Sequence, residues 1–237
     1  MKQQIRKVLA GVGIFLVILM IVGGLFAGVY ITGGVNALLD LPGMKAILGL
    51  DRPKDLAMGE ITDADRASLI AKLGGDPAGW AEASGSIPRV LVSVTLTPKE
   101  AAAFLLSGYG SETFQQLQLK ITEDGWIAAS GIVQLDGVLT VADMSRSDLE
   151  EQIGTLPDEV PFYMELKTAP TEAGSFGITL RQLKIGSITI PGSSLGLDPV
   201  QLDPYVRKFF LTAYGVDLES LSVSGGDFLL EMKAPLG

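Results

Sequence analysis

The 237-residue chain contains no cysteine and no histidine. Without cysteine, the chain has no disulfide, no thiol nucleophile and no thiolate metal ligand. Without histidine, it lacks the usual general base near neutral pH and the commonest metal ligand, so Ser-His-Asp and Cys-His nucleophiles are excluded, and ordinary zinc, haem or copper sites are excluded or disfavoured. We therefore predict that the protein is not an enzyme and holds no metal and no cofactor.

Charge is missing from residues 8 to 39, a stretch of 32 residues close to the N-terminus. Its apolar centre, residues 8 to 31, would be about 36 Å long as a helix, enough to cross a hydrocarbon core of about 30 Å. Basic residues flank only its N-terminal side: Lys2, Arg6 and Lys7. The bias of lysine and arginine toward the cytoplasm predicts a single-pass anchor in the cell membrane with a cytoplasmic N-terminus. Everything after Gly33 is then extracytoplasmic.

A cleaved signal peptide is the competing interpretation of this segment. Signal peptides have an apolar region of about 7 to 15 residues before a small-x-small cleavage site, and this run is longer. Leu25-Phe26-Ala27 also places a bulky side chain where a small one is needed. We therefore favour an uncleaved anchor.

The chain after residue 33 carries 27 acidic and 15 basic residues, a net charge of −12. This charge predicts repulsion from nucleic acid, and from anionic lipid surfaces unless a local basic patch intervenes. We expect no nucleic-acid partner.

The predicted organisation has three parts: the tail and anchor (residues 1–33), a juxtamembrane arm (34–88) and an extracytoplasmic domain (89–237). In the arm, Thr62-Asp63-Ala64-Asp65 predicts the start of a helix that Gly74-Gly75 ends, and Asp76 to Pro88 is typical of a loop.

The domain begins with alternating β-branched residues at Val90 to Thr95, which predict a strand, and Thr97-Pro98-Lys99-Glu100 predicts the start of a helix that runs to Leu106. We expect a second apolar helix from Asp203 to Tyr214 and an exposed short helix over Ser145–Ile153. Further strands are expected at 114–121, 125–135, 162–168, 177–190 with a bend at Gly186, 218–223 and 228–233, and a short piece at 138–141. About seven antiparallel strands predict an α+β fold: an N-terminal transmembrane helix followed by one strongly curved antiparallel sheet wrapped around one or two helices.

Three segments resemble small bacterial membrane-anchored proteins of the YpmS and YceB type, which are similar in architecture to the tubular lipid-binding (TULIP) superfamily. They are the strand-to-helix opening at residues 92–101, the strand Leu183-Lys184-Ile185-Gly186-Ser187-Ile188-Thr189-Ile190-Pro191, and the amphipathic helix before the final hairpin. With the anchor, the likeness covers residues 90 to 233 loosely. It implies a curled sheet around a helix, with an apolar channel for a lipid or another elongated ligand.

The candidate lipid-binding residues lie on the two helices expected to face the sheet: Phe104, Leu105, Phe209, Phe210 and Tyr214. An ordinary core is the default interpretation of such an apolar stripe, and the channel follows from the resemblance. Arg207 and Lys208 would meet a phosphate at the channel mouth, or form the solvated face of the helix.

Other motifs are weaker. Gly192-Ser193-Ser194-Leu195-Gly196 matches the G-x-S-x-G nucleophile pattern, but without histidine we interpret it as loop chemistry. Three acid pairs are explained by helix dipoles and solvation rather than catalysis or calcium binding: Asp63 with Asp65, Glu150 with Glu151, and Asp158 with Glu159.

The leading hypothesis is a non-enzymatic, membrane-anchored extracytoplasmic protein that binds a lipid or another elongated apolar ligand between sheet and helix. The alternative is a structural or accessory subunit of a membrane protein complex in the cell envelope, which would contact other envelope proteins through the anchor and the arm.

Overall fold

The computed structural model describes residues 52–83, 88–108, 110–142, 145–153, 157–170, 176–186, 188–195 and 199–235. The predicted anchor and its cytoplasmic tail lie outside these ranges. Among the described residues, no helix is both long enough and apolar enough to cross a membrane.

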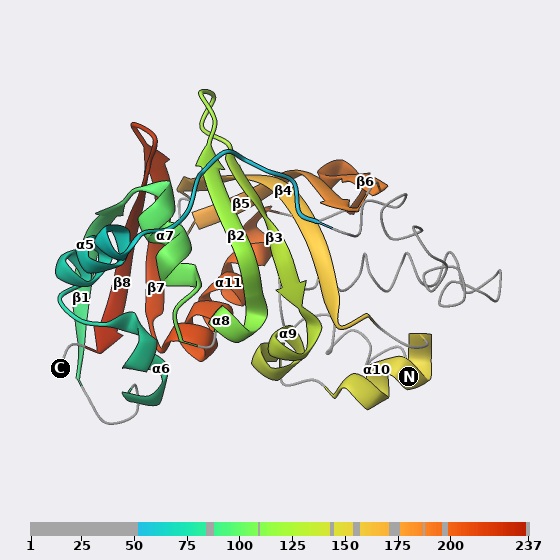
Figure 1. Ribbon diagram of the computed structural model, residues 1–237, viewed down its shortest axis with the longest axis horizontal. Helices are drawn as coiled ribbons and strands as arrows, with labels where there is room; N and C mark the ends of the chain where they lie inside the picture. Colours follow the sequence, from blue (N-terminus) through green and yellow to red (C-terminus); the bar gives the residue numbers. More distant parts are fainter. Residues whose placement is uncertain are drawn as a thin grey trace.

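The fold is α+β, with two antiparallel sheets (Figure 1). The three-stranded sheet has the order β1-β8-β7 and contains β1 (Arg89–Leu96), β7 (Asp217–Ser224) and β8 (Asp227–Pro235). The five-stranded sheet follows chain order and contains β2 (Phe114–Ile121), β3 (Ile127–Gln134), β4 (Glu159–Pro170), β5 (Phe176–Ile185) and β6 (Ile188–Pro191). Neither sheet is closed.

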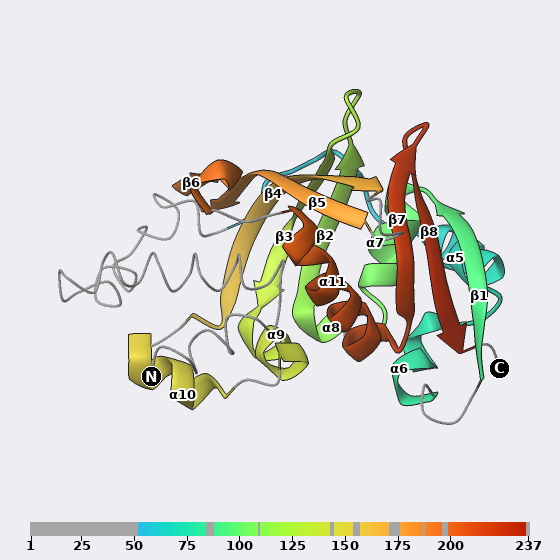
Figure 2. The same ribbon diagram turned by 180° about the vertical axis from the view of Figure 1, so that it is seen from behind.

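The prediction of one continuous sheet is therefore wrong for the described strands. β1 leads directly into α7 (Pro98–Leu105) and then α8 (Gly110–Thr113), so the chain leaves the first sheet before β2 begins. β1 pairs instead with the C-terminal β8, from Arg89 with Pro235 to Leu96 with Phe228. Figure 2 shows α11 (Pro199–Tyr214) between the sheets, where it contacts β5 of one and β7 of the other.

Two predicted helix starts are confirmed by their capping geometry. In α5 (Asp63–Leu73) the Thr62 side chain accepts from the Asp65 amide while Asp65 accepts from the Thr62 amide, and Gly74 ends the helix with φ 73°. In α7, Thr97 and Glu100 form the same reciprocal pair. Each box satisfies two backbone amides that would otherwise lack partners, which is why these starts are readable from sequence.

Glu100 is more than a cap, because its carboxylate is nearly inaccessible. It accepts hydrogen bonds from Ser68 Oγ at 2.5 Å and Lys72 Nζ at 2.7 Å, which join α5 to α7. Burial opposes its ionisation, but the hydrogen bonds from Lys72, Ser68 and the Thr97 amide outweigh burial and lower the pKa of Glu100.

Two other predicted helices are present. α10 (Arg146–Ile153) begins one residue after the predicted Ser145, whereas α11 begins four residues before the predicted Asp203. The strand expected at 138–141 is wrong, because those residues belong to helix α9 (Leu135–Ala142). Leu135, Val138 and Leu139 are all buried, the i, i+3, i+4 spacing of a helix face.

Two connections were also predicted incorrectly. Residues 177–190 do not form one bent strand, because Gly186, at φ 57°, turns the chain back so that Ile185 pairs with Ile188 and β6 folds onto β5. The loop expected from Asp76 contains a 3₁₀ turn (Pro77–Gly79) and helix α6 (Trp80–Ala83). Trp80 is 5% exposed, so its burial holds this segment on the core.

Side chains on both sides of the predicted boundary at residue 89 share one core, to which Leu69, Leu73 and Trp80 contribute together with Phe104 and Tyr214. The segment 52–61 crosses the five-stranded sheet before α5, as the blue trace in Figure 1 shows. It is held there by a hydrogen bond from the Leu56 amide to Gln118 Oε1, at 2.8 Å. The three-part division of the chain stays a prediction.

Candidate apolar binding cavity

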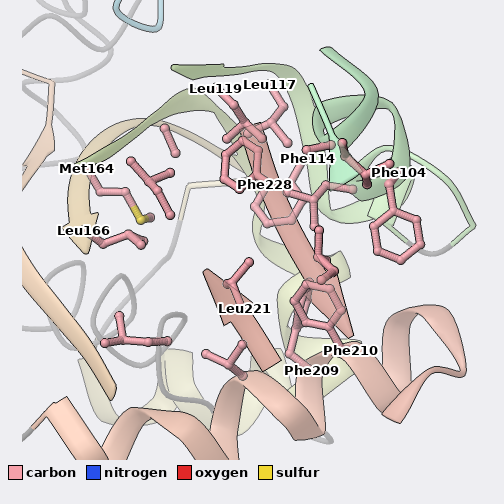
Figure 3. A pocket seen from close by; sticks show the side chains of 18 of the residues that line it. Phe104, Phe114, Leu117, Leu119, Met164, Leu166, Phe209, Phe210, Leu221 and Phe228 are labelled. Carbon is pink, nitrogen blue, oxygen red and sulfur yellow. The ribbon is translucent and has the colours of Figure 1, made fainter. Parts of the chain in front are cut away.

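A cavity of about 150 Å³ lies between the two sheets, α7 and α11, and every residue that lines it is apolar. Figure 3 shows Met164 and Leu166 on one side of the hollow and Leu221 and Phe228 on the other. The lining comes from β1 and α7 (Leu96, Ala101, Phe104, Leu105), β2 and β3 (Phe114, Leu117, Leu119, Ile127, Ala129), β4 and β5 (Phe162, Met164, Leu166, Ile178), α11 (Val206, Phe209, Phe210), and β7 and β8 (Leu221, Phe228, Leu230).

Strand alternation builds the wall contributed by the five-stranded sheet. Leu119 of β2 pairs with Ala129 of β3, which pairs with Met164 of β4, so the three side chains lie in one row on the same face. Successive residues of a strand point to opposite faces of the sheet, so the chain neighbours of these three residues point away from the cavity. Ala129 is the small residue in the middle of this row.

Aromatic rings form the wall on the helix side. Phe104 of α7 stacks on Tyr214 of α11 with ring centroids 5.0 Å apart, and Phe210 lies 6.1 Å from Phe104. Phe209 meets Phe114 of β2 edge to face at 6.2 Å. These contacts pack the two helices against each other and against the sheet.

Tyr214 supports this wall from behind, because it does not line the cavity. It is fully buried and donates a hydrogen bond to the Leu105 carbonyl at 2.8 Å. Burial raises the pKa of Tyr214, so the phenol stays neutral and the hydrogen bond is kept over the whole physiological range.

Of the five candidate residues, four therefore lie at the cavity: Phe104, Leu105, Phe209 and Phe210. The strand residues of the lining were missed, although their alternation was visible in the sequence. What the sequence did not show is that two separate sheets turn these faces toward each other.

The structure explains Arg207 as a link between α11 and β7. Its guanidinium donates to the carbonyls of Leu218 and, at 2.7 Å, Glu219, and it lies 5.3 Å from the centroid of the Phe176 ring. Arg207 is thus bound to the protein's own backbone, while Lys208 is exposed. This arrangement does not support Arg207 as the phosphate ligand that the resemblance suggested.

At least one member of each acid pair has a structural partner. Asp65 is a capping residue, and Arg146 binds Asp136 and Glu150 at 3.0 Å each and Asp158 at 2.7 Å. These hydrogen bonds, led by the one with Glu150, raise the pKa of Arg146 despite its partial burial. In the part of the chain that the structure describes, no group of three acidic residues could hold a metal ion.

The G-x-S-x-G match also has a packing explanation at its first glycine. A Cβ on Gly192 would lie 1.7 Å from the Leu180 carbonyl oxygen, so only glycine fits against β5 there. Gly196 lies outside the described residues.

Comparison with known proteins gives no family: no family model matches the chain, nor does any curated protein or any solved structure. The likeness to the YpmS, YceB and TULIP proteins stays a prediction.

Proposed function

We propose that this chain is a non-enzymatic, membrane-anchored extracytoplasmic protein that binds an acyl chain of a lipid, or another elongated apolar ligand, between its two sheets and α11. The observation that carries the proposal is the cavity, which has no polar side chain in its lining. An apolar hollow of this kind stays dry and gains free energy when an apolar molecule fills it.

The size of the cavity sets how much ligand it takes. A cavity of about 150 Å³ holds a molecule such as benzene, so this one holds about six carbons. At about 0.8 kcal/mol per buried CH₂, six carbons contribute about 5 kcal/mol to binding. A longer chain would leave the cavity past lining residues that are only half-buried, such as Leu105, Phe114 and Leu221.

The membrane part of the proposal rests on the sequence. The uncharged residues 8 to 31 form the single spanning helix, with Lys2, Arg6 and Lys7 on the cytoplasmic side. For a protein anchored by a transmembrane helix, lipid acyl chains are the most abundant apolar molecules nearby.

A specific surface feature favours the second function, an accessory subunit of an envelope complex. Val90 and Leu91 of β1 are 48% and 60% exposed, and β1 is an edge strand among the described strands. An exposed apolar strand edge suits pairing with another protein. A full chain that is monomeric in mild detergent, and that co-purifies with no other envelope protein, would count against this function.

Lipid retention by the chain lacking residues 1–33 tests the leading proposal. Native mass spectrometry and lipid extraction should find bound lipid in the wild type. The lipid held in the cavity should be absent from Ala129→Leu, whose larger side chain projects from the centre of the Leu119-Ala129-Met164 row. Ala103→Leu, at a residue that is buried but does not line the cavity, is the matched control and should keep the lipid. A wild type without bound lipid would reject the proposal.

A further inference from the structure

A second hollow, of about 220 Å³, lies on the opposite face of the five-stranded sheet. Tyr163 is part of its lining, and its chain neighbour Met164 lines the apolar cavity on the other face. Three of the lining residues are bases, namely Arg52, Lys54 and Lys184, and none is acidic. This contrasts with the net charge of −12 after residue 33.

The sheet register brings Lys184 to this place. Tyr163 of β4 pairs directly with Lys184 of β5, which puts both side chains on the same face. Lys184 Nζ lies 5.8 Å from the centroid of the Tyr163 ring. Gly186, which turns the chain from β5 into β6, completes this side of the hollow.

The crossing segment 52–61 brings the other two bases. Leu56 packs with Ala128 and Tyr163 in a small apolar cluster of its own, which fixes the segment on the sheet. Two residues earlier, Lys54 Nζ lies 3.8 Å from the centroid of the Tyr163 ring. One neutral ring therefore faces two ammonium groups that belong to distant parts of the chain.

Glu165, two residues along β4 from Tyr163, is held by other groups. Glu165 accepts a hydrogen bond from the Tyr163 hydroxyl and lies 3.6 Å from Arg181. Burial, and then this hydrogen bond, raise the pKa of Tyr163 to about 12, so the ring carries no charge of its own. Across the described ranges, Arg52, Lys54 and Lys184 form no ion pair. Within the described residues, these three cations thus face one hollow without an ion-pair partner.

We propose that this hollow binds a phosphate group, carried either by free phosphate or by a phospholipid headgroup. Several cations that converge without a protein counter-ion favour a multivalent anion, and phosphate accepts charge-assisted hydrogen bonds from lysine and arginine together. Only residues 32–51 separate Arg52 from the end of the predicted anchor, so headgroups of the same membrane are within reach. The site shares no basic residue with the apolar cavity and does not depend on it.

The test uses the full chain in a neutral detergent, with inorganic phosphate as the first probe and calorimetry as the readout. The wild type should bind phosphate saturably. The triple variant Arg52→Gln, Lys54→Gln, Lys184→Gln should bind it at least about tenfold more weakly, because it removes three converging charges. Arg66→Gln, Arg89→Gln, Lys120→Gln makes the same change of charge at exposed positions outside the hollow and should bind like the wild type. The single variant Lys184→Arg should keep binding, and thermal unfolding shows that each variant is folded.

The second probe separates the two sources of phosphate. Native mass spectrometry counts phosphatidylglycerol molecules retained by the full chain, with phosphatidylcholine as the comparison. Retention of phosphatidylglycerol that is lost in the site variant identifies a lipid headgroup, whereas phosphate binding without such retention identifies free phosphate. Lipid held by the apolar cavity is lost in Ala129→Leu and kept in the site variant, which distinguishes the two sites. No saturable phosphate binding, or equal weakening in both triple variants, would overturn the proposal.

Discussion

Filling the apolar cavity from Ala129 should stabilise the unliganded protein. Ala129→Leu adds three carbons to a space that matches about six. At about 0.8 kcal/mol per buried CH₂ the gain is at most about 2.4 kcal/mol, and the leucine loses about 0.5 to 1 kcal/mol of rotamer freedom. The expected net effect is a free energy of unfolding about 1.5 kcal/mol higher, or a Tm raised by about 3 to 6 °C.

Urea denaturation of delipidated protein measures this change, because bound lipid would stabilise the wild type alone by mass action. The control is Ala103→Leu on α7, which is 1% exposed and does not line the cavity. There the same three carbons have no space and should cost about 1 to 3 kcal/mol by overpacking. If Ala129→Leu destabilises the protein as much as Ala103→Leu does, the hollow beside Ala129 is not open space and the argument for a ligand cavity fails.

Three further substitutions test contacts that hold the cavity walls. Glu100→Gln should lower the free energy of unfolding by about 2 kcal/mol at neutral pH, because it removes a buried, hydrogen-bonded charge. The pKa of Glu100 is lowered on folding from its ordinary 4.5, so its contribution is complete above that pH and is lost as the pH falls below it. Between pH 3 and 7, the free energy of unfolding should therefore depend less on pH in Glu100→Gln than in the wild type. The same pH dependence in both proteins would contradict this. Arg207→Met, which leaves two β7 carbonyls without their donor, should cost about 2 kcal/mol in urea, and a loss below about 0.5 kcal/mol would show that the link to β7 is unimportant. Tyr214→Phe should cost about 1 to 2 kcal/mol through the lost bond to the Leu105 carbonyl, yet leave lipid retention unchanged, since Tyr214 stands behind the cavity wall.

Local chemistry made several elements predictable. The capping boxes at Thr62 and Thr97 depend on residues only three positions apart, and the glycine that ends α5 acts on its own turn. Strand alternation at 114–121 is likewise a property of neighbours along the chain. Local signals were ambiguous at 138–141. This short apolar run predicted a strand, but its residues form helix α9.

The apolar pattern of two helices predicted four of the residues that line the cavity, but this pattern could not predict the cavity itself. It exists because β1 pairs with β8, more than 130 residues away, and because β2 starts a second sheet. The basic hollow depends in the same way on a register, Tyr163 with Lys184, and on the segment 52–61, which crosses the five-stranded sheet.

The uncharged segment at the N-terminus, the lack of histidine and cysteine, the capped helices and most of the strands can be read from the amino-acid sequence, because each depends on residue type or on near neighbours. The separation into two sheets, the hydrogen bonds from Arg207 to β7 and the meeting of three bases at Tyr163 follow only from the folded structure. Those arrangements result from contacts between residues far apart in the chain, whose partners no local pattern specifies.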